Sequence, residues 1–200
     1  FHDIGNNAIQ VWTSEPAEDG TIVAHNRISK VDFTDGGTGQ NGNGVIIFRA
    51  GNVIVEGNRI SDCAFTAVRN NSGANCQILN NNISRMGEVA IYCEFAFTGA
   101  VVSGNIIEET GLGISVTNFD KNGRLATVAN NVVRGCRGPG VLKETSGTGI
   151  HCEGDATVTG NVVEETGFWI RGDYSWLGGS PDGRVLDKRT QERGLLEIKC

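Results

Sequence analysis

Two acidic residues and a lysine near the end of the chain have the types and spacing of a metal-dependent hydrolytic site. Asp182 lies in the stretch SPDG, while Glu197 and Lys199 flank Ile198 in LEIKC. Alternation along a strand places Glu197 and Lys199 on one side and Ile198 on the other. Two short strands joined by a turn near 187–192 would bring both carboxylates to one Mg²⁺ ion, which prefers oxygen ligands and activates water. Taken alone, the triple is equally compatible with ordinary surface charge.

A second candidate site lies on strands expected in the middle of the chain. Alternation turns the aliphatic and cysteine side chains of AIYCE and GIHCE inward and their polar neighbours outward. The outward set is Arg69, Tyr92, Glu94, His151 and Glu153, with Ser115 and Thr117 on the same face. An aromatic ring can stack on sugar rings, and carboxylates can bind hydroxyls, a cation or a proton. The pattern predicts a polysaccharide-binding face, and a solvated charged face without a ligand is the alternative.

The elements that would position these residues follow from a repeat. The repeated motif reads TIVAHNRIS, VIVEGNRIS, CQILNNNIS, AVVSGNIIE, ATVANNVVR and ATVTGNVVE, and its asparagines are Asn26, Asn58, Asn81, Asn105, Asn131 and Asn161. These asparagines are 32, 23, 24, 26 and 30 residues apart. Such spacing indicates a unit of about 23 residues with insertions, which is typical of a solenoid whose units bury a core only by stacking.

Each unit contains two or three short strands and no helical pattern. β-Branched residues precede most of these asparagines, an aliphatic residue follows each of them by two positions, and a second alternating strand comes roughly ten residues later in several units. Such strands stack as parallel sheets at ~4.8 Å per coil. An asparagine at the same corner of every coil tolerates a left-handed turn conformation and can hydrogen-bond its neighbours along the stack. The regular asparagines disfavour the alternative, an antiparallel sandwich.

The repeats resemble the right-handed parallel β-helix proteins of the pectate-lyase-like architecture. The stretches GNGVIIFRAGNVIVEGNRISDCAFTAVRNNSG and EVAIYCEFAFTGAVVSGN are similar, more closely, to the twin-arginine-translocated repeat proteins of bacteria. This resemblance covers most of residues 1–165 and implies export of a folded chain to the periplasm or the outside of the cell. The fold class predicted is therefore all-β, a right-handed parallel β-helix with a short C-terminal extension.

The final segment departs from the repeat. NVVEETGFWI (161–170) still matches NIIEETGLGI (105–114), but no asparagine ladder continues beyond it. We therefore expect a β-helix repeat domain over residues 1–167 and an incomplete second segment over 168–200. GFWIRGDYSWLGGSPDGRV and GLLEIKC resemble the YqaJ-type viral recombinases, relatives of the phage lambda exonuclease among the PD-(D/E)XK nucleases.

This second resemblance implies a metal-dependent DNA exonuclease, located in the cytoplasm. It makes Asp182 and Glu197 the carboxylates that bind Mg²⁺ or Mn²⁺, and Lys199 the residue that orients or activates water. The family's upstream helices, with a further carboxylate and the DNA-binding surface, are replaced by the repeat. We expect residues 168–200 to form an irregular extension or hairpin without nuclease activity, because a two-stranded hairpin is marginal by itself. Whether both segments belong to one natural protein stays open.

Charge and cysteine usage limit the function classes further. The net charge of −6 argues against a nucleic-acid-binding face along the whole chain, and no apolar run approaches the ~18 residues of a membrane span. Cys63 and Cys136 fall in one column and Cys93 and Cys152 in another, each pair too far apart for a disulfide. We expect most cysteines to be small buried residues. No cysteine–histidine spacing indicates zinc, and we expect no cofactor for the solenoid.

Together these observations predict an exported β-helix repeat protein that is either a structural solenoid or one that binds carbohydrate. Polysaccharide is then the partner, and lyase or hydrolase activity of the solenoid is left open. The alternative is the exonuclease, for which nucleic acid is the partner and Mg²⁺ or Mn²⁺ the cofactor.

Overall fold

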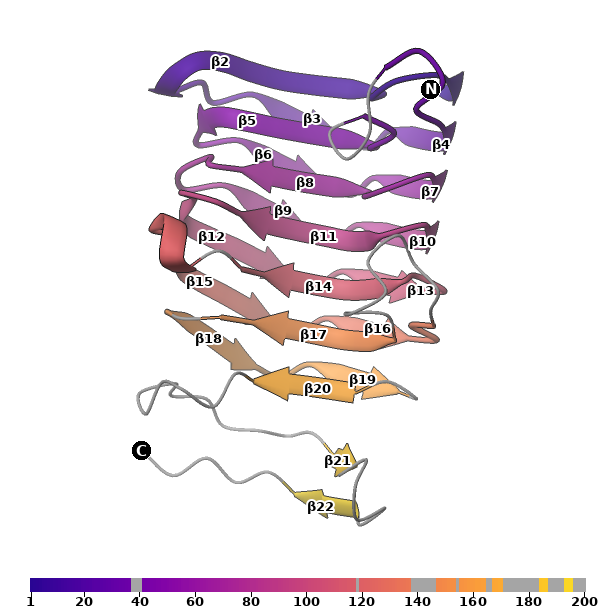
Figure 1. The fold of residues 1–200 in the computed structure, drawn as a ribbon, viewed down its shortest axis with the longest axis vertical. Helices are drawn as coiled ribbons and strands as arrows, with labels where there is room; N and C mark the ends of the chain where they lie inside the picture. The colour runs from indigo at the N-terminus through magenta and orange to yellow at the C-terminus, as the bar shows by residue number, and fades with distance from the viewer. Residues whose placement is uncertain are drawn as a thin grey trace.

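The chain winds into a stack of parallel β-strands (Figure 1). Three sheets, here called A, B and C, run along the stack. Each strand pairs with the strand three places later in the chain, because one coil contributes one strand to each sheet. The all-β parallel solenoid predicted from the repeats is thereby confirmed. The computed structural model describes residues 1–36, 41–117, 119–137, 147–153 and 155–164, and the backbone of the strands at 167–170, 184–186 and 193–195.

The strands of each sheet follow in order of stacking. Sheet A consists of β1 (His2–Ile4), β4 (Arg27–Val31), β7 (Arg59–Cys63), β10 (Asn82–Met86), β13 (Ile106–Glu108), β16 (Val132–Arg134) and β19 (Val162–Glu164). Sheet B consists of β2 (Ile9–Glu18), β5 (Val45–Gly51), β8 (Val68–Asn71), β11 (Val89–Glu94), β14 (Leu112–Val116), β17 (Thr148–Cys152) and β20 (Gly167–Ile170). Sheet C consists of β3 (Ile22–Ala24), β6 (Ile54–Glu56), β9 (Gln77–Leu79), β12 (Thr98–Ser103), β15 (Arg124–Ala129) and β18 (Ala156–Thr159). A 3₁₀ turn, η1 (Phe119–Lys121), and an antiparallel pair, β21 (Arg184–Leu186) with β22 (Arg193–Leu195), complete the described elements.

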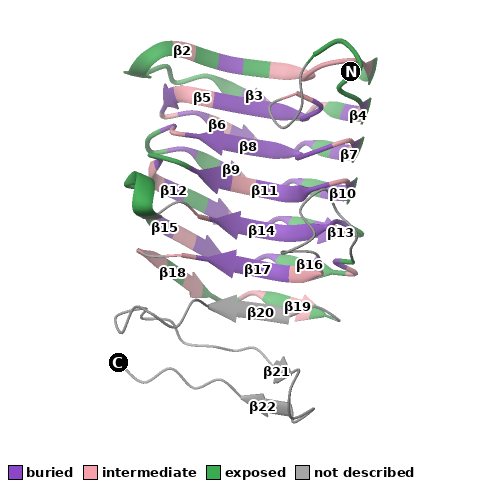
Figure 2. Ribbon diagram, in the orientation of Figure 1, coloured by how far each residue is buried: buried purple, intermediate pink, exposed green. Residues whose placement is uncertain are grey.

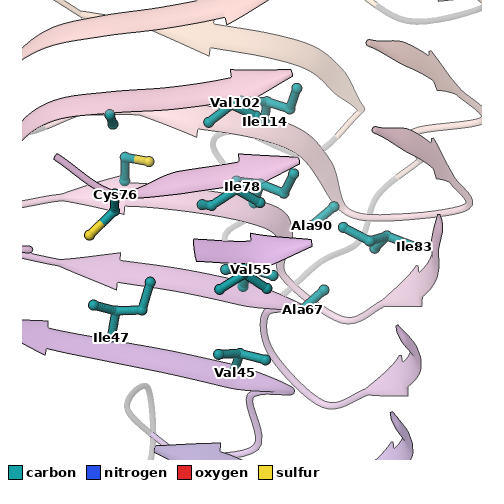
Figure 3. Packing of buried hydrophobic residues seen from close by; sticks show 14 of the residues in the cluster. Val45, Ile47, Val55, Ala67, Cys76, Ile78, Ile83, Ala90, Val102 and Ile114 are labelled. Carbon is teal, nitrogen blue, oxygen red and sulfur yellow. The ribbon is translucent and has the colours of Figure 1, made fainter. Parts of the chain in front are cut away.

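Aliphatic columns fill the interior of the coil. In sheet A the residue two positions after each repeated asparagine points inward, and Ile28, Ile60, Ile83, Ile107 and Val133 are all at most 1% exposed. Sheet C faces them with a second in-register column of buried aliphatic residues, which includes Val55, Ile78 and Val102 (Figure 3). Burial follows this alternation in sheets A and C, whereas the middle strands of sheet B are buried along most of their length (Figure 2). Strands of three residues form here because stacking supplies a core that no single coil contains.

The six repeated asparagines form one column at the corner between sheets C and A, as predicted. From Asn26 to Asn131, the backbone N–H and the side-chain Nδ2 of each donate to Oδ1 of the next asparagine at 2.9–3.0 Å. Each Nδ2 from Asn58 onward also donates to a backbone carbonyl of the preceding coil, for example Asn105 to Ile78 at 3.0 Å. These buried amides are therefore satisfied, and the ladder joins neighbouring coils.

The left-handed turn lies one residue earlier than predicted. The residues that precede the ladder asparagines have positive φ angles: His25 (57°), Gly57 (61°), Asn80 (53°), Gly104 (69°), Asn130 (56°) and Gly160 (62°). Glycine and asparagine tolerate this conformation best. The preceding residue makes the turn, which leaves the ladder asparagine free to point its amide along the stack.

The described cysteines are free thiols in the interior: Cys63, Cys76, Cys93, Cys136 and Cys152. Cys93 and Cys152 share a column with Val116 between them, as predicted. Burial raises the pKa of the Cys63 and Cys152 thiols to about 12 and that of Cys76 to about 11. These thiols stay protonated at neutral pH and pack as small apolar side chains.

Candidate ligand-binding face

The outer face of sheet B brings together all five residues of the predicted polysaccharide-binding set. One column carries Gln10, Ile46, Arg69, Tyr92, Ser115 and His151 in successive strands. The neighbouring column carries Trp12, Phe48, Asn71 and Glu94 and continues through Thr117 and Glu153. Parallel pairing of successive strands holds this register, although the number of residues between a ladder asparagine and the next strand of sheet B varies from coil to coil.

The charged centre of this face is buried, which neither sequence interpretation anticipated. Arg69 is 8% exposed, Glu94 3% and His151 9%, whereas Tyr92 and Glu153 are partly exposed. Arg69 donates from Nε to Glu94 Oε1 at 2.6 Å, and its Nη1 lies 3.4 Å from Glu88 Oε2. The side chains are removed from water because they pair with one another between coils.

Further donors complete the environment of the two carboxylates. Asn71 Nδ2 donates to Glu94 Oε1 at 3.2 Å, and Thr66 Oγ1 donates to Glu88 Oε2 at 3.0 Å. The Arg69 guanidinium also lies over the Tyr92 ring, 5.1 Å from its centroid. One arginine thus holds two acids and an aromatic ring in place, so the ring is fixed on the surface of the sheet.

Burial changes the proton affinity of this cluster. It raises the pKa of the Glu88 carboxyl, and Arg69 and Thr66 oppose that rise only in part. Burial also raises the pKa of the Tyr92 hydroxyl to about 12, with the negative charges of Glu94 and Glu88 acting in the same direction. The Glu88 carboxyl therefore binds a proton more readily than an ordinary glutamate, and Tyr92 keeps its proton as a hydrogen-bond donor.

A smaller polar group lies further along the same columns. His151 Nε2 is 3.6 Å from Glu153 Oε1, and Thr117 Oγ1 donates to Glu153 Oε2 at 2.9 Å. This group offers a partly exposed carboxylate to hydroxyl groups.

An aromatic platform lies at the β2–β5 end of the face. The Trp12 ring is 64% exposed and stacks on Phe48, with ring centroids 6.1 Å apart and planes 25° apart. The guanidinium of Arg49 lies over the Phe48 ring, 4.9 Å from its centroid. Sequence reasoning missed Trp12, Phe48 and Glu88. Extending the alternation to AIQVW and VIIF would have found the two aromatic residues, whereas Glu88 precedes its strand and carries no such signal.

A groove of about 760 Å³ lies away from this face, at the corner where the strands of sheet A end. Its lining includes Asp32 and one column of left-handed residues whose charges alternate in sign: Asp3, Lys30, Asp62, Arg85 and Glu109. Arg85 binds Asp62 through two contacts of 2.6 and 2.8 Å, and Lys30 lies 3.6 Å from Asp3. Charges of adjacent coils therefore neutralise one another at this corner.

The predicted nuclease residues, Asp182, Glu197 and Lys199, lie outside the described residues, so their metal site stays a prediction. β21 and β22 pair as an antiparallel two-stranded sheet, and sheet B continues through β20 to Ile170. Within the described ranges, no group of three histidine, cysteine, aspartate or glutamate side chains is arranged to hold a metal ion. The same part of the chain contains no helix long and apolar enough to cross a membrane.

Comparison with known proteins agrees with the stacked coils. A family model described as a right-handed β-helix region matches residues 7–181. Comparisons with curated proteins and with solved structures gave no significant match. Because the family match extends over most of the chain and the strands form the parallel coils that it describes, this protein belongs to the right-handed β-helix family.

Proposed function

We propose that this protein is an exported β-helix that binds polysaccharide on the outer face of sheet B. The observation that carries the proposal is the Trp12–Phe48 platform, in which Trp12 is 64% exposed and lies in the column of Glu94, next to the column of Tyr92. Aromatic faces pack against the apolar faces of sugar rings, and flanking carboxylates accept hydrogen bonds from sugar hydroxyls.

The dimensions of the face suit an extended chain of sugars. From Trp12 on β2 to Glu153 after β17 the column crosses six strands, roughly 24 Å at the usual strand spacing. Partly exposed Tyr92 lies between the two ends, beside the buried Arg69. A linear glycan lying across the coils would meet an aromatic ring at one end, a phenol in the middle and a carboxylate at the other.

Binding without catalysis agrees with the burial and pairing of Glu88 and Glu94. Glu88 and Glu94 are both held by Arg69 and are 6% and 3% exposed. A general acid or base must reach the proton that it transfers, and these carboxylates are engaged inside the face. The proposal therefore gives them a structural role, in which they hold Arg69 and, through it, the Tyr92 ring.

The test is a glycan array followed by calorimetric titration with neutral and uronic-acid oligosaccharides. We expect the wild-type chain to bind, and Trp12→Ala to weaken binding about tenfold, the scale of one aromatic contact. Ile22→Ala is the matched control, because Ile22 is 61% exposed on sheet C, away from this face. Absence of binding to every glycan, or equal losses in both variants, would leave a structural solenoid without this ligand.

Export is supported by the resemblance of the repeats to twin-arginine-translocated proteins. It is tested by fractionating cells of the source organism that express the complete reading frame. Recovery from the cytoplasm alone would contradict export while leaving the glycan-binding test unaffected.

A further inference from the structure

The outer face of sheet A carries a local excess of positive charge. Arg27 on β4 and Arg59 on β7 are paired in register on adjacent strands, and both are exposed. The residues that follow each of them, Ile28 and Ile60, are buried, so the arginine side chains point away from the core. The same motif, Asn-Arg-Ile-Ser, thus places two guanidinium groups side by side at roughly 4.8 Å strand spacing.

These two arginines lack the carboxylate partner that Arg69, Arg85 and Arg134 have. Within the described residues, neither Arg27 nor Arg59 forms an ion pair, and like charges directly opposite on adjacent strands repel one another. By contrast, Arg85 and Arg134 each bind a carboxylate at 2.6 Å. In a chain of net charge −6, an uncompensated pair of adjacent cations is unexpected unless something else neutralises it.

A groove of about 330 Å³ runs over this pair. Its lining contains three arginines, three serines and an asparagine, and no carboxylate: Arg27, Arg59, Arg85, Ser29, Ser61, Ser84 and Asn82, with the backbone of Ile28 and Ile60. The serines form one column beside the arginines, in register across β4, β7 and β10. We call this set the arginine–serine groove.

The groove ends within the same sheet. In the next strands, Asn82 of the arginine column is followed by the exposed apolar residues Ile106 and Val132. The serine column continues as Glu108 and Arg134, which bind each other. The surface that carries arginines and serines is therefore confined to three coils, so it is a local site and does not extend along the whole sheet.

We propose that the arginine–serine groove binds a tetrahedral oxyanion, a sulfate or phosphate group. Two guanidinium groups offer planar pairs of N–H donors that match such oxygens, and the serine hydroxyls add donors from the side. A carboxylate offers only two coplanar oxygens, whereas a tetrahedral anion can engage both arginines and a serine at once. This site lies on a different sheet from the proposed polysaccharide face and stands independently of it.

The test compares free and chain-borne anions on the whole chain at low ionic strength. The probes are inorganic sulfate, inorganic phosphate and a short dextran sulfate, measured by calorimetry and by thermal unfolding. The variant is Arg27→Gln with Arg59→Gln, and the control is Lys121→Gln with Arg124→Gln, which removes the same charge from exposed positions elsewhere.

We expect the wild type and the control to bind and to be stabilised alike, and the double arginine variant to lose at least tenfold in affinity. Ser61→Ala should lose about threefold, which attraction by net charge alone would not produce. A dextran sulfate affinity well above that of inorganic sulfate would identify a chain-borne group, and equal affinities would identify a free anion. Lack of binding to all three probes, or equal losses in the control, would overturn the proposal.

The double arginine variant also serves as its own check on folding. Because it removes a repulsion, it should unfold at a temperature no lower than the wild type in the absence of anion. A well-folded variant that still binds sulfate with wild-type affinity would equally overturn the site.

Discussion

The outer faces of sheets A and B differ in whether their charged side chains are buried in ion pairs or exposed to solvent. On sheet B, Arg69 meets Glu94 from the next coil, and both are buried. On sheet A, Arg27 meets Arg59 from the next coil, and both remain exposed. Strand spacing is the same in both sheets, so the residue at the same position of the next coil decides whether a charged side chain is buried in an ion pair or stays exposed to solvent and ligands.

The corner groove beside sheet A is the intermediate case. Its left-handed column alternates in sign, and Arg85 and Asp62 pair while remaining 50% and 40% exposed. Exposed pairs contribute little to stability, whereas a broken buried pair leaves an uncompensated charge. The comparison therefore predicts large effects on sheet B, small losses at the corner and small gains on sheet A.

Replacing the arginine at the centre of sheet B should have the largest effect. Arg69→Met keeps much of the side-chain volume but leaves Glu88 and Glu94 buried without their cation, which should lower the free energy of unfolding by about 3–5 kcal/mol at neutral pH. Urea denaturation followed by circular dichroism measures this loss. A loss of unfolding free energy below 1 kcal/mol would mean that water reaches Glu88 and Glu94 more readily than their burial indicates.

The buried acid of sheet B should make stability depend on pH. The pKa of Glu88 is raised mainly by burial, so its contribution is fully present below the ordinary glutamate pKa of about 4.3 and is lost as the pH rises through the folded-state value. Glu88→Gln should flatten this decline, because the amide does not titrate. Unfolding curves from pH 4 to 8 test this, and parallel profiles of wild type and variant would contradict it.

The corner pair should behave in the opposite direction with pH. A hydrogen bond from Arg85 lowers the pKa of the Asp62 carboxyl, so this pair contributes above the ordinary aspartate value and is lost as the pH falls through the lowered one. Asp62→Asn should cost about 0.5 kcal/mol at pH 7, since both partners are partly exposed. An equal loss of unfolding free energy in strong acid, where the Asp62 carboxyl of the wild type is protonated, would show that the cost of the substitution is not electrostatic.

Removing one cation from sheet A should have the smallest effect, and with the reverse sign. Arg59→Gln should raise the free energy of unfolding by about 0.3 kcal/mol at low salt, because it relieves repulsion by Arg27. The gain should vanish in about 0.5 M NaCl, where screening is strong. Arg124→Gln, on sheet C, serves as control, and a destabilised Arg59 variant would show that the arginine has a partner in the folded chain.

The sequence predicted the stacked coils and their columns, but not which charged side chains are buried in ion pairs. The ladder asparagines and the columns through Tyr92 and His151 follow from periodicity, which depends only on local spacing. The burial of Arg69 could not be predicted in this way, because it depends on Glu88, which lies outside the alternating strand, and on contacts between coils. The left-handed turns were displaced by one residue, since Gly-Asn and Asn-Asn offer two residues able to adopt them.

The ladder also bears on how such a chain can change over evolutionary time. The Nδ2 atom of each asparagine stays 2.9–3.0 Å from Oδ1 of the next, although successive asparagines are 23 to 32 positions apart in the sequence. The longest stretches add their residues between sheets A and B, where β5 begins fourteen residues after β4 ends but β8 begins only five after β7. The amide column fixes the pitch at the corner between sheets C and A, so the corner between sheets A and B can lengthen without disturbing the stack. New surface loops can therefore arise by insertion at that corner, one coil at a time, while the rest of the scaffold is inherited unchanged.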